Sequence, residues 1–133
     1  MAPETHVEIA HEGDIVTARQ KGRELAAATG LSRTEQTLIA TAISELARNI
    51  VVYARRGEVV LAQVEQHGRR GVLVIARDEG PGIANPELAM RDGYSTSRSL
   101  GMGLPGARRL MDEFELSTAV GKGTTITMKK WVR

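Results

Sequence analysis

The chain has 133 residues, the size of one ordinary domain, so we expect a single domain over residues 1–133. With 41% hydrophobic and 26% charged residues it can fill a core, which excludes a disordered segment. A net charge of +2 and only four aromatic residues (one Phe, one Trp, two Tyr) argue against a nucleic-acid partner. The absence of Cys excludes disulfides and thiolate metal sites. Without a basic start followed by an apolar segment, we expect a soluble, cytoplasmic protein with no membrane contact.

The first elements are a strand and a helix. Apolar and polar residues alternate over residues 7–10, which predicts a short strand. Asp14 is in place to cap a helix that runs to about Ala28, and Thr29-Gly30 is predicted to end it.

The second helix has the clearest pattern in the chain. Ser32 and Glu35 have the spacing of a capping box, and Gly57 is predicted to close the helix. Apolar residues recur at helical intervals between these two ends: Leu38, Ile39, Ala42, Ile43, Leu46, Ile50, Val51 and Ala54.

An antiparallel hairpin is expected next, with strands over residues 58–65 and 72–77 and a turn over residues 67–71. Residues 78–100 are then rich in Gly, Pro, Ser, Asp and Asn, with about one helical turn near residues 86–90. Irregular segments of this length in a compact domain are usually functional or disordered, so this one is the first candidate for a ligand site.

A short helix and two strands complete the chain. Pro105 suits the first turn of a helix through Met111 or Asp112, and strands are expected over residues 114–120 and 124–132. The tally of about three helices and five strands predicts an α+β fold. We expect a two-layer sandwich in which a mixed, mostly antiparallel sheet carries the helices on one face.

Glu45 and Asn49 are the first polar residues that interrupt an apolar pattern. They lie four residues apart and therefore share a helical face, Asn49 at the edge of the core stripe and Glu45 just outside it. An amide oxygen suits Mg²⁺, and a carboxylate can take a proton from an attacking hydroxyl. For a single pair of this kind, a solvated Glu beside an Asn that hydrogen-bonds locally is the simpler explanation.

Asp78-Glu79-Gly80-Pro81-Gly82-Ile83 follows an apolar strand directly. An aspartate at such a strand end is partly desolvated and needs a donor, which the amine of adenine would supply. Gly80 and Gly82 would let the backbone approach a flat base. The alternative is an ordinary tight turn, for which Asp and Gly are common residues.

Gly101-Met102-Gly103-Leu104-Pro105-Gly106 fits the G-x-G-x-x-G pattern, yet no strand precedes it and too little chain follows for a further βαβ unit. The residues around Lys122 do not form a phosphate-binding P-loop either, because Gly123 follows the lysine. What remains is a glycine-rich loop at a helix N-terminus, which can bind phosphate or act as a simple hinge. Arg108 and Arg109 on that helix could contact phosphate, although one of two adjacent arginines is usually solvated. His6, His11 and His67 lack the spacing of a metal site and are expected at the surface.

In chain order, these segments resemble the ATP-binding domain shared by gyrase, Hsp90-type chaperones, histidine kinases and mismatch-repair ATPases, the GHKL or Bergerat fold. Glu45 to Asn49 matches the N box of that family, and Asp78 to Gly82 matches its first glycine box. Gly101 to Gly106 matches its second glycine box, and Thr124 and Thr125 match its late Gly-Thr element.

The resemblance implies that ATP and Mg²⁺ are the cofactors. Asp78, with Gly80, Gly82 and Ile83, would bind adenine near Thr124 and Thr125, and Asn49 would hold Mg²⁺. Backbone N–H groups from Gly101 through Met102, Gly103 and Leu104 would receive the triphosphate. Glu45 would be the catalytic residue that orients or deprotonates the acceptor hydroxyl, and residues 90–100 would form a lid over the nucleotide.

Within this family the chain is similar to RsbT-type serine/threonine switch kinases of the stressosome, which regulate sigma factors in the stress response. The shared strings are residues 14–16, 41–50, 101–106 and 109–114 and the Lys130-Trp131 ending. The resemblance implies phosphorylation of STAS-domain proteins of RsbS or RsbR type, then activation of a PP2C-type phosphatase of RsbU type. Two alternatives stay open: an anti-sigma factor kinase of RsbW or SpoIIAB type, and an adaptor that binds ATP without catalysis.

Overall fold

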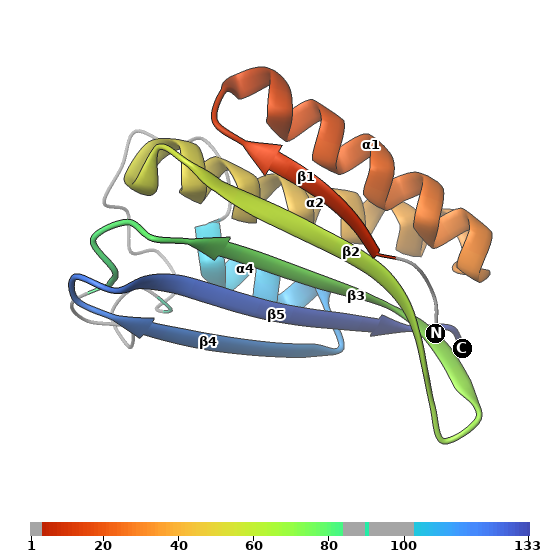
Figure 1. Ribbon diagram of the computed structural model, residues 1–133. Helices are drawn as coiled ribbons and strands as arrows, with labels where there is room; N and C mark the ends of the chain where they lie inside the picture. The colour runs from red at the N-terminus through yellow and green to blue at the C-terminus, as the bar shows by residue number, and fades with distance from the viewer. Residues whose placement is uncertain (1–3, 84–89, 91–102) are drawn as a thin grey trace.

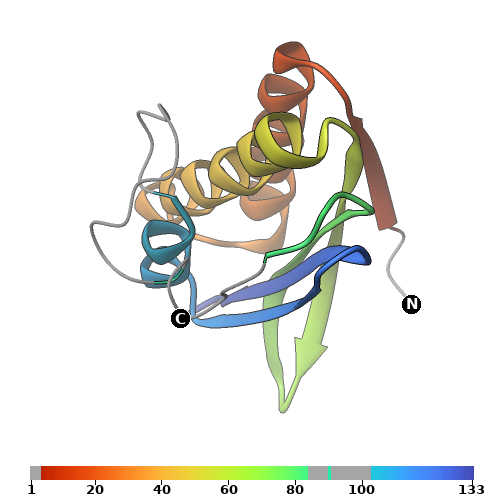
Figure 2. The same ribbon diagram turned by 90° about the vertical axis from the view of Figure 1, so that its left-hand side faces the viewer.

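The computed structural model describes residues 4–83, 90 and 103–133. The expected helical turn near residues 86–90 and the expected lid over residues 90–100 therefore lie, apart from Met90, outside the described residues. Gly101 and Met102 are outside them as well. Five strands form one sheet in the order β1-β2-β3-β5-β4, and all four neighbouring pairs are antiparallel. Helices α1, α2 and α4 cover one face of this sheet (Figures 1 and 2). The predicted two-layer α+β fold is confirmed. The expected mixed sheet is corrected, because every pair among the described strands is antiparallel.

The chain enters the fold through β1 (Glu4–Ile9) and α1 (Glu12–Thr29). The prediction that Asp14 caps α1 is wrong, because His11 is the N-cap and Asp14 lies three residues inside the helix. Its carboxylate oxygen Oδ2 accepts hydrogen bonds from the backbone N–H groups of Ala10 (2.8 Å) and His11 (2.9 Å). These bonds lower the pKa of Asp14. The predicted end of α1 is confirmed, since Gly30 takes the left-handed conformation with φ 108°.

Helix α2 (Arg33–Asn49) begins with the expected capping box. Ser32 Oγ accepts from the Glu35 N–H, and the Glu35 carboxylate accepts from the Ser32 N–H, both at 3.1 Å. The helix then widens into a π-helical turn, η1 (Ile50–Ala54), directly after Asn49. The prediction that the helix closes at Gly57 is therefore corrected: the helical part ends at Ala54, and Gly57 already belongs to the next strand.

The hairpin joins β2 (Gly57–Gln66) to β3 (Arg69–Asp78). Its turn is only His67-Gly68, both with positive φ (54° and 79°), so it is shorter than the five residues expected. Helix α4 (Gly103–Leu110) has Pro105 in its first turn, as predicted, and β4 (Glu113–Ala119) and β5 (Gly123–Trp131) follow.

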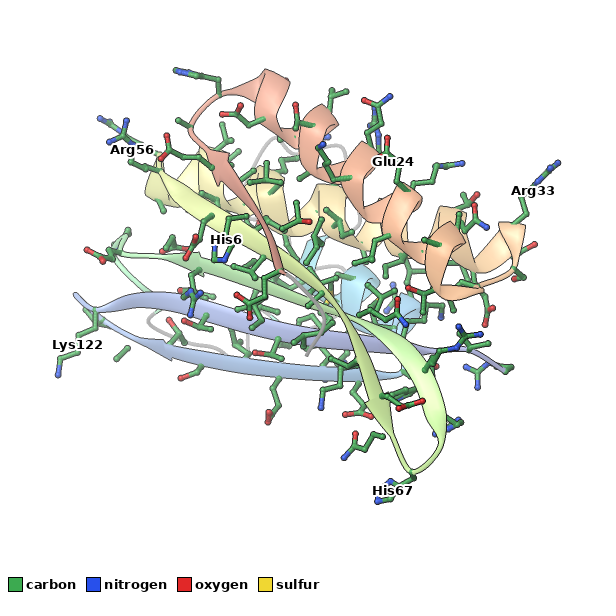
Figure 3. All side chains as sticks on the ribbon, turned by 45° about the vertical axis from the view of Figure 1, so that its right-hand side comes forward. His6, Glu24, Arg33, Arg56, His67 and Lys122 are labelled. Carbon is green, nitrogen blue, oxygen red and sulfur yellow. The ribbon has the colours of Figure 1, made fainter. Side chains whose placement is uncertain are left out.

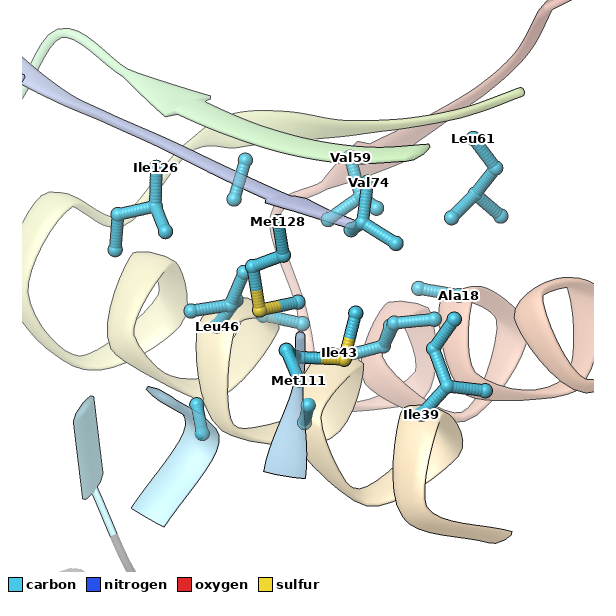
Figure 4. Packing of buried hydrophobic residues seen from close by; sticks show 14 of the residues in the cluster. Ala18, Ile39, Ile43, Leu46, Val59, Leu61, Val74, Met111, Ile126 and Met128 are labelled. Atoms are coloured by element: carbon cyan, nitrogen blue, oxygen red, sulfur yellow. The ribbon is translucent and has the colours of Figure 1, made fainter. Parts of the chain in front are cut away.

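The core lies between the sheet and the helices. Ile39, Ile43 and Leu46 of α2 face the sheet, and Met111 fills the space beside them (Figure 4). Val59 and Leu61 of β2, Val74 of β3, and Ile126 and Met128 of β5 meet them from the sheet, all at most 4% exposed.

Residues 33–54, which comprise α2 and η1, are long and apolar enough by length and composition to cross a membrane. Half of the apolar window is buried inside the fold. Because α2 packs against the sheet, α1 and α4, its role as the central core helix accounts for this apolarity.

Candidate functional site

β3 ends, β5 begins and the π-helical turn passes at one end of the sheet (Figure 1), and Asp78, Gly80, Gly82 and Thr124 lie at this end. In the sheet register, Asp78 at the end of β3 lies between Gly57 and Thr124. A Cβ atom added to Gly57 would lie 2.9 Å from Ile50 Cγ2 and 3.1 Å from Asp78 Cβ. The end of the N-box helix and the Asp78 strand end are therefore close neighbours, although 28 residues separate Ile50 from Asp78.

Asp78 is half-buried and folds back on its own loop. Its Oδ1 accepts a hydrogen bond of 2.9 Å from the Gly80 N–H, which holds the carboxylate in one orientation. Within the described residues, its second oxygen, Oδ2, receives no hydrogen bond. A half-buried acceptor that is oriented and still open suits an amine donor such as the exocyclic group of adenine.

The first glycine box packs tightly against two other elements. A Cβ atom on Gly80 would lie 2.6 Å from the Cβ of Ala54 in η1. A Cβ on Gly82, whose φ is 76°, would overlap the carbonyl oxygen of Ala119 in β4. The internal packing of the chain thus already requires glycine at both positions, and the expected approach of a base to them stays a prediction.

Hydroxyl groups tie this loop to the β4–β5 hairpin. The Ile83 N–H donates to Thr118 Oγ1 (2.9 Å), and Thr118 Oγ1 lies 2.9 Å from Thr124 Oγ1. Thr124 is on the same face of the sheet as Asp78, whereas Thr125, its neighbour in the strand, points to the opposite face, as side chains alternate along β5. The structure therefore joins Ile83 and Thr124 to the site and separates Thr125 from it. Sequence reasoning missed Thr118, because no local motif marks it.

Glu45 is more deeply placed than its position on the helical wheel indicated. Glu45 is only 7% exposed, whereas the sequence pattern placed it just outside the core stripe of the helix. It is buried because α4 packs against this side of α2. The Glu45 Oε2 atom accepts a hydrogen bond of 3.1 Å from the backbone N–H of Gly103, the first residue of α4. The structure thus brings the predicted catalytic carboxylate together with the second glycine box, 58 residues further along the chain.

Asn49 lies one turn beyond Glu45 and is half-buried. Its side-chain amide has no hydrogen-bond partner among the residues that the structure describes. An amide oxygen in this state fits a hard cation such as Mg²⁺. Over residues 4–83, 90 and 103–133, no three His, Cys, Asp or Glu side chains cluster as a metal site.

The start of α4 supplies backbone groups rather than side chains. Gly103 has φ 70°, a conformation that favours glycine, and the Leu104 side chain is 5% exposed in the core. Only the backbone of Leu104 could therefore face a ligand. Arg108 and Arg109 are exposed in the last turn of α4, at the end opposite to Gly103.

Comparison with known proteins connects this geometry to a class. The family model of the histidine kinase-like ATPase domain matches residues 9–130. The solved structure of the RsbU and RsbW domains of a Mycobacterium tuberculosis protein superposes with a TM-score of 0.63 at 25% identity, covering 96% of this chain and 32% of that one. The mycobacterial sensor histidine kinase MprB superposes with a TM-score of 0.58 at 12% identity over 100% of this chain and 99% of that one, which shows the fold.

Two curated relatives refine the class. The serine/threonine-protein kinase RsbT of Bacillus subtilis (strain 168) is 50% identical over 133 residues, the full length of both chains. The anti-sigma F factor of a Geobacillus species (strain WCH70) is 34% identical over 105 residues, 74% of this chain and 70% of that protein. The chain belongs to the histidine kinase-like ATPases and, within them, to the family of the serine/threonine-protein kinase RsbT. It is a protein serine/threonine kinase, and its membership of an ATPase family implies that it uses ATP.

Proposed function

We propose that this kinase transfers phosphate from Mg·ATP to a serine or threonine of a STAS-domain protein of RsbS or RsbR type. It then leaves that protein and activates a PP2C-type phosphatase of RsbU type in a sigma-factor cascade. The observation that carries the proposal is the contact of the buried Glu45 carboxylate with the first N–H of α4. Helix starts of this kind commonly bind phosphate, so a carboxylate beside one is in reach of a phosphoryl transfer. The full-length identity of 50% to an RsbT kinase supports the choice of partners.

Each residue has a role that follows from its chemistry. Oδ2 of Asp78 would accept from the adenine amine, and the Asn49 amide oxygen would hold Mg²⁺. ATP supplies the phosphoryl group, and Mg²⁺ neutralises its charge. The Gly103 N–H, with Gly101 and Met102 before it, would receive phosphate oxygens.

Glu45 completes the reaction as the proton acceptor. It would take the proton from the acceptor hydroxyl while that oxygen bonds to the γ-phosphorus and the bond to the bridging oxygen of ADP breaks. The step needs no side chain beyond Glu45 for the proton, so positioning and charge neutralisation supply the rest of the catalysis.

The direct test is intact-mass analysis after incubation with Mg·ATP and a STAS-domain protein of RsbS type from the same genome. We expect the STAS protein to gain the mass of one phosphate group. Glu45→Ala should bind ATP and fail to transfer, and Glu24→Gln, which removes an exposed charge from α1 (Figure 3), should transfer normally. No gain of mass with the wild type would instead favour an adaptor that binds ATP without catalysis.

A second candidate is an anti-sigma factor, favoured by the relatives of that name at about 30% identity. It would use the same site and also capture a sigma factor. Affinity purification with the tagged kinase distinguishes the two functions: a retained PP2C-type phosphatase supports the RsbT type, and a retained sigma factor supports the alternative. In either case we propose a single kinase domain over residues 1–133 that acts in the cytoplasm.

A further inference from the structure

The backbone N–H of Gly103, at the start of α4, already has a hydrogen-bond acceptor in this structure. Gly103 is the first residue of α4, so its N–H has no acceptor within the helix. In this structure its acceptor is the Glu45 Oε2 atom at 3.1 Å, from a side chain that is 7% exposed. A carboxylate in this position is stabilised by the positive end of the helix dipole.

A phosphate oxygen would need the same donor. The N–H groups at the start of a helix are the usual ligands of phosphate, and an N–H donates fully to only one acceptor at a time. A carboxylate and a phosphate that competed for this one N–H would also repel each other at close range.

We propose that the Glu45 carboxylate occupies the Gly103 N–H when the nucleotide site is empty, and that a nucleotide phosphate displaces it on binding. Glu45 is thereby held away from the acceptor hydroxyl in the empty kinase and released as a proton acceptor only when phosphate is present. This inference rests on the proposed function, because it requires that nucleotide phosphate binds at α4.

Nucleotide affinity is the first test. Adenosine, ADP and Mg·ATP are titrated into wild type, Glu45→Ala and the control Glu24→Gln by calorimetry. Removal of the competing carboxylate should tighten ADP and ATP binding by about tenfold and leave adenosine binding unchanged. Equal ADP affinity in wild type and Glu45→Ala would overturn the proposal, as would an equal change for adenosine.

Amide hydrogen exchange at Gly103 tests the displacement itself, and it separates displacement from simple charge repulsion. In the free protein, Glu45→Ala should speed exchange of the Gly103 N–H. Glu45→Gln, which keeps an acceptor oxygen, should change it less. With saturating ADP the three proteins should exchange at the same rate, because phosphate then holds the N–H in each. Faster exchange that persists in ADP-bound Glu45→Ala would overturn the inference and leave the proposed function intact. Failure of the wild type to bind any adenine nucleotide would overturn both.

Discussion

Asp78 serves the fold and the site at once. Its Oδ1 accepts from the Gly80 N–H at 2.9 Å, so half of the carboxylate shapes the glycine loop. No group among the described residues donates a hydrogen bond to its Oδ2, so this oxygen can accept one from a ligand. This division suggests a substitution that separates the two roles.

Asp78→Asn should keep the loop and weaken adenine binding. The Asn Oδ1 can still accept from Gly80, whereas an amide nitrogen in place of Oδ2 meets the adenine amine as donor against donor. We expect adenosine and ATP affinity to fall by at least about tenfold, with little change in melting temperature. Glu79→Gln, in the next and exposed residue, is the matched control and should bind normally. Unchanged adenosine binding by Asp78→Asn would remove Asp78 from the adenine site.

Gly82 tests the packing of the same loop. Its φ of 76° and the overlap of an added Cβ with the Ala119 carbonyl predict that Gly82→Ala lowers the free energy of unfolding. We expect a loss of about 2 kcal/mol or more in urea denaturation. Gly13→Ala, where an added Cβ has no atom within 4 Å, should not destabilise the protein. Equal stability of Gly82→Ala and wild type would show that the close contact between Gly82 and Ala119 of β4 does not stabilise the fold.

At the scale of elements, the sequence predicts those helix ends that are set by residues close together in the chain. The Ser32 and Glu35 capping box and the Gly30 helix end are local signals, and the structure contains both. The Asp14 prediction failed because His11 takes the N-cap position of α1, which makes Asp14 the third residue of the helix. From there its carboxylate accepts from the His11 N–H. The π-helical turn after Asn49 has no local signal. It lies where Ala54 packs against Gly80, a contact between segments far apart in the chain.

Ser32→Ala tests the α2 cap. It removes the acceptor of the Glu35 N–H, and we expect a loss of about 1 kcal/mol in the free energy of unfolding. Ser32→Asn, which restores a capping oxygen, should recover most of this loss. If both variants have the same free energy of unfolding as the wild type, the cap contributes nothing to the stability of the fold.

At the scale of the whole molecule, the sheet face without helices carries a cluster of charged residues that come from three strands and lie far apart in the sequence. His6 of β1 is labelled in Figure 3. It lies 3.2 Å from Glu58 of β2 and 3.1 Å from Glu4, and Glu58 also pairs with Arg77 of β3 at 3.1 Å. The hydrogen bonds to Glu58 and Glu4 raise the pKa of His6, and the bond to His6 is the main cause that lowers the pKa of Glu58.

These directions fix a pH dependence. Because the pKa of His6 is raised in the fold, its stabilising contribution is present below the ordinary value of 6.5 and is lost as pH rises through the folded value. The contribution of Glu58 is present above its ordinary value of 4.5 and is lost as pH falls through the lowered folded value. We expect the stability difference between wild type and His6→Gln to be largest between these two ordinary values and to shrink toward pH 8. Chemical denaturation across this range measures it. In a Glu58→Gln background the difference should become smaller, because Glu58 is the largest cause of the raised pKa of His6 and Glu4 remains as the other. A pH-independent difference would contradict the assignment.

In the site as a whole, the sequence predicts the residues that belong to motifs but not the contacts between distant segments. Glu45, Asn49, Asp78 and Thr124 could be found because their segments follow one another in a family order. The bond from Gly103 to Glu45 and the link from Ile83 through Thr118 could not, because each joins residues 35 or more positions apart through packing alone. Thr125 shows the converse error, since a motif names residues without regard to which face of a strand they occupy.

The central claim is that these separated segments form one nucleotide site. Titration of ¹⁵N-labelled protein with Mg·ADP, followed by amide chemical shifts, tests it most directly. We predict that shifts concentrate at Asn49, Asp78 to Ile83, Gly103 and Thr124, while His67 and Gly68 at the far hairpin turn stay unchanged. Absence of binding, or shifts that centre on the far turn or the open sheet face, would contradict the account.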